Sequence, residues 1–187
     1  VIAVGAGLTI PFIGLFFFKI HRLDSDEFAI ISAFATLIAF NIVLYVPIIK
    51  DKLGYKLAVP LTQTIAIIAL IVLAFTEIMS FEWAIYIAVA AYVIRQPLMN
   101  MAGPMTSDIV MDYVGERNQE MMSALTSAVW SGSWFISSVI FQVLRQIGLQ
   151  YVYVFLITAA LYFFGVFLYY LLILDYEKKI KLREVVS

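Results

Sequence analysis

Six long apolar runs dominate the sequence, at residues 1–18, 28–49, 57–75, 83–105, 121–144 and 151–174. Each is close to the ~20 residues that cross about 30 Å of hydrocarbon as a helix. The runs lack the alternation of apolar and polar residues over about 10 positions that marks the strands of a membrane barrel. They predict an all-α membrane protein, a single six-helix domain over residues 1–187 with a polar tail at 175–187.

The composition supports this class and excludes others. The chain is 64% hydrophobic and 13% charged, against roughly 45–50% and about 25% in soluble domains. A net charge of −1 argues against nucleic-acid binding, which favours a basic surface. With no cysteine and one histidine, the sequence predicts no metal site and no cofactor. An intramembrane enzyme ranks last, because no cluster of catalytic side chains stands at a suitable spacing.

Lysine and arginine are unevenly divided between the two sides of such a bundle. The connections after the second and fourth runs, together with the tail, carry eight of them: Lys50, Lys52, Lys56, Arg117, Lys178, Lys179, Lys181 and Arg183. The other side carries Lys19, Arg22 and Arg145. Because cytoplasmic loops are enriched in lysine and arginine, we expect a multi-pass protein of the cell (plasma or inner) membrane with a cytoplasmic C-terminus.

Polar side chains interrupt the fourth run. Arg95 lies deep inside it, beside a face formed by Gln96 and Asn100 at helical spacing. A charge at that depth usually faces a cavity or a partner. Arg95 would hold an anionic group of a solute or couple to a titrating carboxylate. Further cavity candidates stand on the second and fifth runs: Thr36, Asn41, Ser127, Trp130 and Trp134. The alternative for such residues is helix–helix packing.

The connection "DKLGYK" at 51–56 has a spacing that a simple positive anchor does not explain. Gly54 allows a tight turn, and Asp51 offers an acceptor for the N-terminus of a neighbouring helix. Lys52 and Lys56 can pair with acids of a neighbouring loop or with lipid phosphates. Such a charged contact would act as a gate, stable when the cytoplasmic helix ends are together and broken when they part. The gate candidates are Asp51, Lys52, Gly54, Lys56, Glu116 and Arg117.

This loop resembles the signature loop of the major facilitator superfamily, G-x-x-x-D-R/K-x-G-x-R/K. Pro47 stands where the family usually has glycine, which favours the second, weaker copy of the motif. The stretch "DYVGERNQEMMSAL", with Glu116 and Arg117, is similar to the connection between helices ten and eleven. The resemblance implies the C-terminal half of a twelve-helix transporter, helices seven to twelve, built as an inverted repeat of three plus three helices.

The resemblance implies a secondary transporter of small solutes that works by alternating access in the lipid bilayer. Val1 lies inside an apolar run, so we expect an N-terminal six-helix half, or a second copy of the chain, as partner. Coupling to a proton follows from the resemblance alone. The aromatic cavity walls favour efflux of amphipathic compounds over sugar uptake. The alternative is a six-helix membrane scaffold or assembly subunit, which leaves Arg95 and the loop unexplained.

Overall fold

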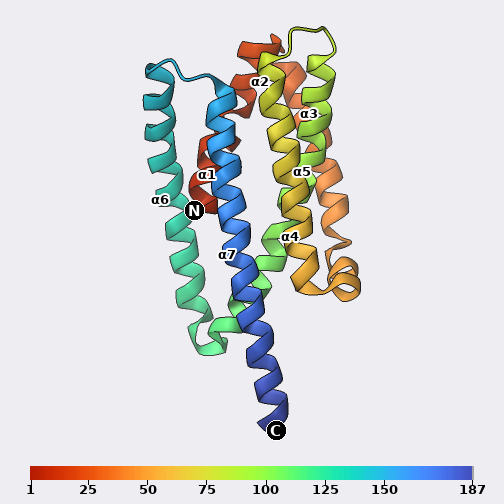
Figure 1. Cartoon of the computed structure of the whole chain (residues 1–187), viewed down its shortest axis with the longest axis vertical. Helices are drawn as coiled ribbons and strands as arrows, with labels where there is room; N and C mark the ends of the chain where they lie inside the picture. Colours follow the sequence, from red (N-terminus) through yellow and green to blue (C-terminus); the bar gives the residue numbers. More distant parts are fainter. Residues whose placement is uncertain (187) are drawn as a thin grey trace.

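In the computed structural model, which describes the backbone of residues 1–186 and the side chains of residues 1–179, every regular element is helical (Figure 1). The first segment comprises α1 (Ile2–Thr9), the short 3-10 helix η1 (Ile10–Phe12) and α2 (Ile13–His21). The others are α3 (Ser25–Val43), α4 (Val46–Phe75), η2 (Thr76–Ile78), α5 (Ala84–Val114), η3 (Glu116–Asn118), α6 (Gln119–Gln146) and α7 (Tyr151–Val186). The predicted all-α class and its six long helical segments are confirmed.

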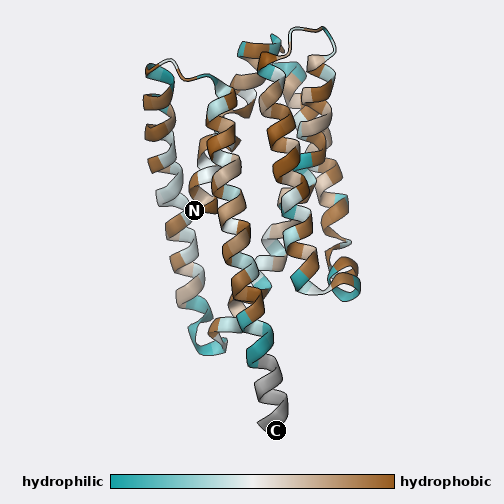
Figure 2. Cartoon of the chain, in the orientation of Figure 1, coloured by the Kyte–Doolittle hydropathy of each residue, from teal (hydrophilic) through white to brown (hydrophobic). Residues whose placement is uncertain are grey.

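Five segments within the described residues are long and apolar enough to cross a membrane: Ile2–His21, Ser25–Val43, Val46–Ile78, Glu116–Gln146 and Tyr151–Lys179. The sixth, α5, is long enough at 31 residues, but polar side chains interrupt its apolar sequence. Figure 2 shows hydrophilic residues gathered near the helix ends and hydrophobic residues along the helix lengths. The helices therefore have the dimensions of a multi-pass membrane protein.

Two boundaries differ from those expected from the sequence. α3 begins early, at Ser25, because Asp24 and Glu27 form a capping box in which the Asp24 N–H donates to the Glu27 carboxylate at 3.1 Å. It also ends early, at Val43, and most of the expected loop at 50–56 is helical and belongs to α4. Gly54 alone has non-helical angles there, φ 66° and ψ 164°, a region that only glycine adopts readily.

The helices run alternately up and down, which divides their connections between two ends (Figure 1). The α3–α4 and α5–α6 connections and the last turns of α7 lie at what we call the tail-side end. The α2–α3, α4–α5 and α6–α7 connections lie at the opposite end. This division matches the grouping of lysines and arginines made from the sequence. Which end faces the cytoplasm stays a prediction. At the C-terminus, α7 continues to Val186, through the residues expected as a tail.

Each helix has a small set of packing partners. α4 packs along both α5 and α7, α3 packs on α5, and α1 packs on α6 and α7. α5 and α6 make little contact, although only a short connection joins them. α3 and α6 are the least buried of the membrane-length helices. Their outward faces are apolar, as the exposed Phe34 and Phe135 illustrate.

Two buried clusters form the core. The larger is rich in aromatic side chains, among them Phe16, Phe17, Tyr92, Phe155 and Tyr162, and includes buried residues of every helix from α1 to α7. The smaller cluster contains no aromatic residue among its buried members: Val46, Ala58, Val59, Met101, Met105, Ile109 and Ile173. Its residues come from the ends of α4, α5 and α7 that meet at the tail-side end. The packing of large rings is therefore concentrated away from that end.

Candidate functional site

α5 carries the polar residues of the site on an unbroken helix. Pro97 and Pro104 lie inside it, yet the helix continues through both to Val114. Polar side chains near them bond to backbone carbonyls of the same helix: the Asn100 amide donates to the Gln96 carbonyl at 2.9 Å, and the Thr106 hydroxyl to the Ala102 carbonyl at 2.8 Å. Such local bonds satisfy polar groups in an apolar environment without another helix.

A cavity of about 360 Å³ opens beside this polar face. It lies among α1, α4, α5, α6 and α7, and its volume falls within the range of small-molecule sites. Four of the eight residues predicted as cavity candidates line it: Arg95, Gln96, Asn100 and Trp130. Helical spacing on α5 thus predicted three of the lining residues, and the polar stripe on α6 predicted the fourth.

Among the described residues that line the cavity, Arg95 alone is charged. Its side chain is buried, with 1% of its surface exposed. One guanidinium nitrogen lies 3.5 Å from the Tyr162 hydroxyl, and the guanidinium carbon lies 5.9 Å from the centre of that ring. Among the described residues, Nε of Arg95 has no hydrogen-bond acceptor, and no carboxylate lies within 4.0 Å of its guanidinium. A buried and unpaired charge is costly, by several kcal/mol.

The other four predicted cavity residues lie elsewhere. Thr36 and Asn41 are exposed on α3, where they donate to the carbonyls of Ser32 and Leu37, each at 2.8 Å. α3 packs on α5 but does not border the cavity. Ser127 and Trp134 are exposed on α6 and are not part of the lining. The structure therefore does not bring these four together with Arg95.

Several lining residues were not predicted from the sequence. Gln63 comes from α4, Thr126 from α6, and Tyr162 and Tyr169 from α7. The middles of α4 and α7 hold few polar residues, so their sequences do not indicate a part in a cavity lining. Gln63 is the one carboxamide in α4, and it was the residue from which a polar lining position on that helix could have been predicted. Nothing in the pattern of the sixth run distinguishes Tyr162 from its other tyrosines.

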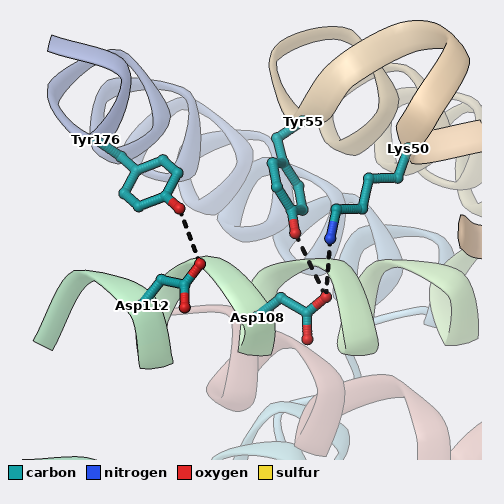
Figure 3. A network of polar contacts seen from close by, with 5 residues as sticks. All are labelled: Lys50, Tyr55, Asp108, Asp112 and Tyr176. Carbon is teal, nitrogen blue, oxygen red and sulfur yellow. Dashed lines mark hydrogen bonds and ion pairs between the residues drawn. The ribbon is translucent and has the colours of Figure 1, made fainter. Parts of the chain in front are cut away.

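A second set of polar contacts lies at the tail-side end (Figure 3). Lys50 pairs with Asp108, with 3.6 Å between Nζ and the carboxylate oxygen. The Tyr55 hydroxyl donates to the same oxygen at 3.4 Å. One turn further along α5, Asp112 accepts a hydrogen bond of 2.9 Å from the Tyr176 hydroxyl. We call these five residues the tail-side network.

All contacts of the tail-side network are between side chains, and they link three helices. α5 supplies both carboxylates, α4 supplies Lys50 and Tyr55, and α7 supplies Tyr176. A neighbouring pair extends it, in which the Tyr113 hydroxyl donates to Asp175 at 2.8 Å. The members are solvent-accessible, with 37% of the Lys50 side chain and 58% of the Asp108 side chain exposed. Exposed pairs of this kind form and break readily.

The predicted gate residues occupy this end without forming its contacts. Gly54 gives the kink in α4, and a Cβ there would meet nothing within 4 Å. The others are exposed or half-exposed and make no side-chain hydrogen bond or ion pair with described residues: Asp51, Lys52, Lys56, Glu116 and Arg117. Their neighbours Lys50 and Tyr55 make the contacts instead. Asp51 therefore lacks the helix N-terminal contact expected of it.

A carboxylate does lie at the start of a neighbouring helix, but at the opposite end. There the Glu77 side chain, in η2, accepts from the backbone N–H of Val152 in the first turn of α7. Arg145 donates to the carbonyl of Leu149 and lies over the Tyr151 ring, 4.0 Å from its centre. A ring nitrogen of His21 and the Thr76 hydroxyl are 3.0 Å apart. His21 is half-buried in this set.

Comparison of the chain with models of protein families, with curated proteins and with solved structures finds no match. The resemblance to the major facilitator superfamily therefore rests on the loop motifs in the sequence. What the geometry adds is a cavity with one buried charge among long apolar helices, and a set of breakable contacts at one end of them.

Proposed function

We propose that the chain is a six-helix half of a secondary transporter of small solutes, working by alternating access in the cell membrane with its tail-side end in the cytoplasm. The observation that carries the proposal is the Arg95 cavity. Membrane-length helices that serve only as a scaffold have no use for a buried, unpaired arginine at the edge of a space of about 360 Å³. An intramembrane charge points by default to a functional site.

The outer surface supports membrane insertion. Large apolar side chains are exposed along the helices, including Ile30 on α3, Ile68 on α4 and Phe163 on α7. Soluble monomers rarely expose contiguous apolar surface on this scale, whereas lipid is an apolar solvent for it. Hydrophilic residues, in contrast, gather near the helix ends (Figure 2).

The helix packing supports an inverted repeat of three plus three. Such a repeat relates the α1–α2 segment to α5, α3 to α6, and α4 to α7. Under this exchange the α3–α5 contact becomes the α6–α1 contact, and the α4–α5 contact becomes the α7–α1 contact. The α4–α7 contact is exchanged with itself. All five of these pairs are packing partners, as a repeat across a pseudo-two-fold axis requires.

The same exchange relates the two least buried helices, α3 and α6. The outward faces of α3 and α6 are apolar, and the described residues leave both uncovered. Because the exchange relates the two faces, they suit a second body with the same repeat. We therefore propose that a further six-helix half, or a second copy of this chain, packs against α3 and α6. The part of the cavity lining that the structure describes contains no carboxylate, so a residue that couples transport to protons is proposed to belong to that second body.

Cysteine accessibility tests alternating access without a known substrate. The chain has no native cysteine, so the Asn100→Cys variant carries a single thiol in the cavity lining. We expect a membrane-impermeant maleimide to label this thiol both in right-side-out and in inside-out vesicles, because alternating access opens the cavity to each face in turn. The matched control is Ile68→Cys, on the exposed apolar surface of α4, which we expect to be labelled from neither face.

The possible results separate the alternatives. Labelling of Asn100→Cys from neither face would contradict alternating access and favour a scaffold. Rapid labelling of Ile68→Cys would contradict the membrane placement of α4. Solute flux by the full-length protein in proteoliposomes then gives the direct test of transport.

A further inference from the structure

We propose that the cavity binds a small organic anion, a monocarboxylate with an apolar aromatic or branched body, whose carboxylate pairs with Arg95. This inference deepens the proposed function and rests on it, because it names the class of solute that the transporter would carry. Four observations lead to it: the charge balance of the cavity, the free donors of Arg95, the distance to the nearest acids on the same helix, and the apolar lining.

The cavity has a positive charge that nothing in its lining balances. Of the lining residues that the structure describes, Arg95 is the only ionisable one apart from tyrosines, since the other polar residues are neutral: Gln63, Gln96, Asn100, Thr106, Ser107 and Thr126. Neutral amides and hydroxyls can solvate a guanidinium, but they do not neutralise it. In an environment of low dielectric, an opposite charge is therefore strongly favoured at this position.

The guanidinium is also prepared to receive such a group. It presents five N–H donors in a planar fork, a geometry that matches a carboxylate with two parallel hydrogen bonds. Only one contact, to the Tyr162 hydroxyl, involves a described side chain. The Nε–H is buried without an acceptor, and a buried donor without an acceptor is rare in folded proteins. A bidentate carboxylate would satisfy the edge that includes Nε.

The acids of α5 are too far along the helix to supply this charge. Asp108 is 13 residues beyond Arg95, which is about 20 Å at 1.5 Å per residue. It is also engaged with Lys50 and Tyr55, while Asp112 is engaged with Tyr176. Among the described side chains, none of the acids thus pairs with Arg95.

The remaining lining suits an apolar body attached to the anionic group. Three methionines face the cavity, Met99, Met111 and Met122, and aromatic rings come from Trp130, Tyr162 and Tyr169. Methionine adapts to irregular shapes, and aromatic side chains offer flat apolar surfaces. A strongly hydrated inorganic anion would leave these surfaces unused, which is why we favour an amphipathic carboxylate over phosphate or sulfate.

Three probes of nearly the same shape test the proposal on the full-length protein in nanodiscs: benzoate, neutral benzamide and cationic benzylammonium. Isothermal titration calorimetry measures the affinity for each. We expect benzoate to bind about tenfold or more tightly than benzamide, since a hydrogen-bonded charge is worth more than a neutral bond, and benzylammonium to show no binding.

Variants then assign the preference to Arg95. Arg95→Gln should remove the benzoate preference, while Arg95→Lys should keep part of it, because the charge remains but the fork is lost. The matched control, Arg22→Gln, removes a guanidinium at the opposite end and should bind benzoate as the unaltered protein does. If Arg95→Gln fails to fold, the three-probe preference of the unaltered protein and the Arg95→Lys result still decide.

Two results would overturn the proposal. One is equal binding of benzoate and benzamide, and the other is benzoate binding that Arg95→Gln leaves unchanged. Absence of benzoate binding together with flux of another solute would refute the anion site but leave the transporter standing. Binding of benzoate at Arg95 without flux of any solute would support the site and contradict transport.

Discussion

At the opposite end of the bundle, side chains bond to backbone groups near the start of α7, whereas at the tail-side end the polar contacts that join α4, α5 and α7 are between accessible side chains. Glu77 accepts from the first turn of α7, and Arg145 donates to a backbone carbonyl, both partly buried. Asp108 and Asp112 instead receive Lys50, Tyr55 and Tyr176 in accessible positions. The large aromatic cluster supports the first end, and a cluster without buried aromatic residues supports the second.

The difference shows how one apolar bundle can combine a fixed end with an adjustable one. Partly buried contacts to the backbone restrict a helix end to one position, because breaking them leaves a buried polar group unpaired. Exposed side-chain pairs can be replaced by water at little cost. We therefore expect substitutions at the opposite end to change stability, and substitutions in the tail-side network to change access to the cavity.

The largest effect on stability should come from the aromatic cluster. Phe16 is fully buried among other rings, so Phe16→Ala should lower the free energy of unfolding by about 3–5 kcal/mol. Thermal unfolding in nanodiscs measures the change. The matched control is Phe163→Ala, since Phe163 is 65% exposed on α7 and belongs to neither of the α3 and α6 faces that a second body is proposed to cover, and it should have little effect. Equal losses in the two variants would contradict the assignment of the core.

A smaller loss should follow removal of the carboxylate at the start of α7. Glu77→Ala leaves the Val152 N–H without its acceptor and removes a negative charge from a helix N-terminus. We expect a loss of about 1–2 kcal/mol. Glu82→Ala is the matched control, because Glu82 belongs to the same connection but is exposed. If the two variants unfold at the same temperature, the Glu77 contact does not hold α7.

Much of the fold followed from the sequence because apolar run length depends directly on membrane thickness. The six segments, their alternation and the division of the loops required only lengths and charges. The boundary between α3 and α4 was missed for a local reason: residues 46–53 are short of a full span but still form helical turns, and only Gly54 interrupts them. Charge and glycine suggested a loop where the chain forms a kinked helix.

The candidate site was predicted where a single helix determines it and missed where two helices must meet. Helical spacing places Gln96 and Asn100 on one face of α5 with Arg95 beside it, and all three line the cavity. Thr36 and Asn41 are likewise polar residues within a long apolar helix, but α3 packs outside the cavity. Similarly, Asp51 occupies the position of the aspartate in the loop motif, but its neighbour Lys50 forms the ion pair with Asp108. Which face of a helix meets its neighbour depends on tertiary packing, which periodicity does not encode.

The tail-side network gives the next prediction, with little effect on stability and a measurable one on access. Asp108→Asn removes the charge that Lys50 pairs with. We expect the tail-side labelling rate of the Asn100→Cys reporter to rise by up to about fivefold, the equivalent of an exposed pair worth at most about 1 kcal/mol. Asp51→Asn, which removes an unpaired charge from the same end, should leave the rate unchanged. If both variants raised it equally, net charge and not the pair would control access.

The smallest expected effect is that of salt. Raising the ionic strength from about 0.05 M to about 0.5 M shortens the screening length and weakens exposed charge pairs more than buried ones. The labelling rate of the Asn100→Cys reporter from the tail side should therefore rise modestly, and the rise should disappear in the Asp108→Asn background. The difference between the unfolding temperatures of the Glu77→Ala and Glu82→Ala variants should be the same at both ionic strengths, because salt screens a partly buried contact to the backbone poorly. A salt effect that persisted in Asp108→Asn would show that another charge at the tail-side end controls access to the cavity.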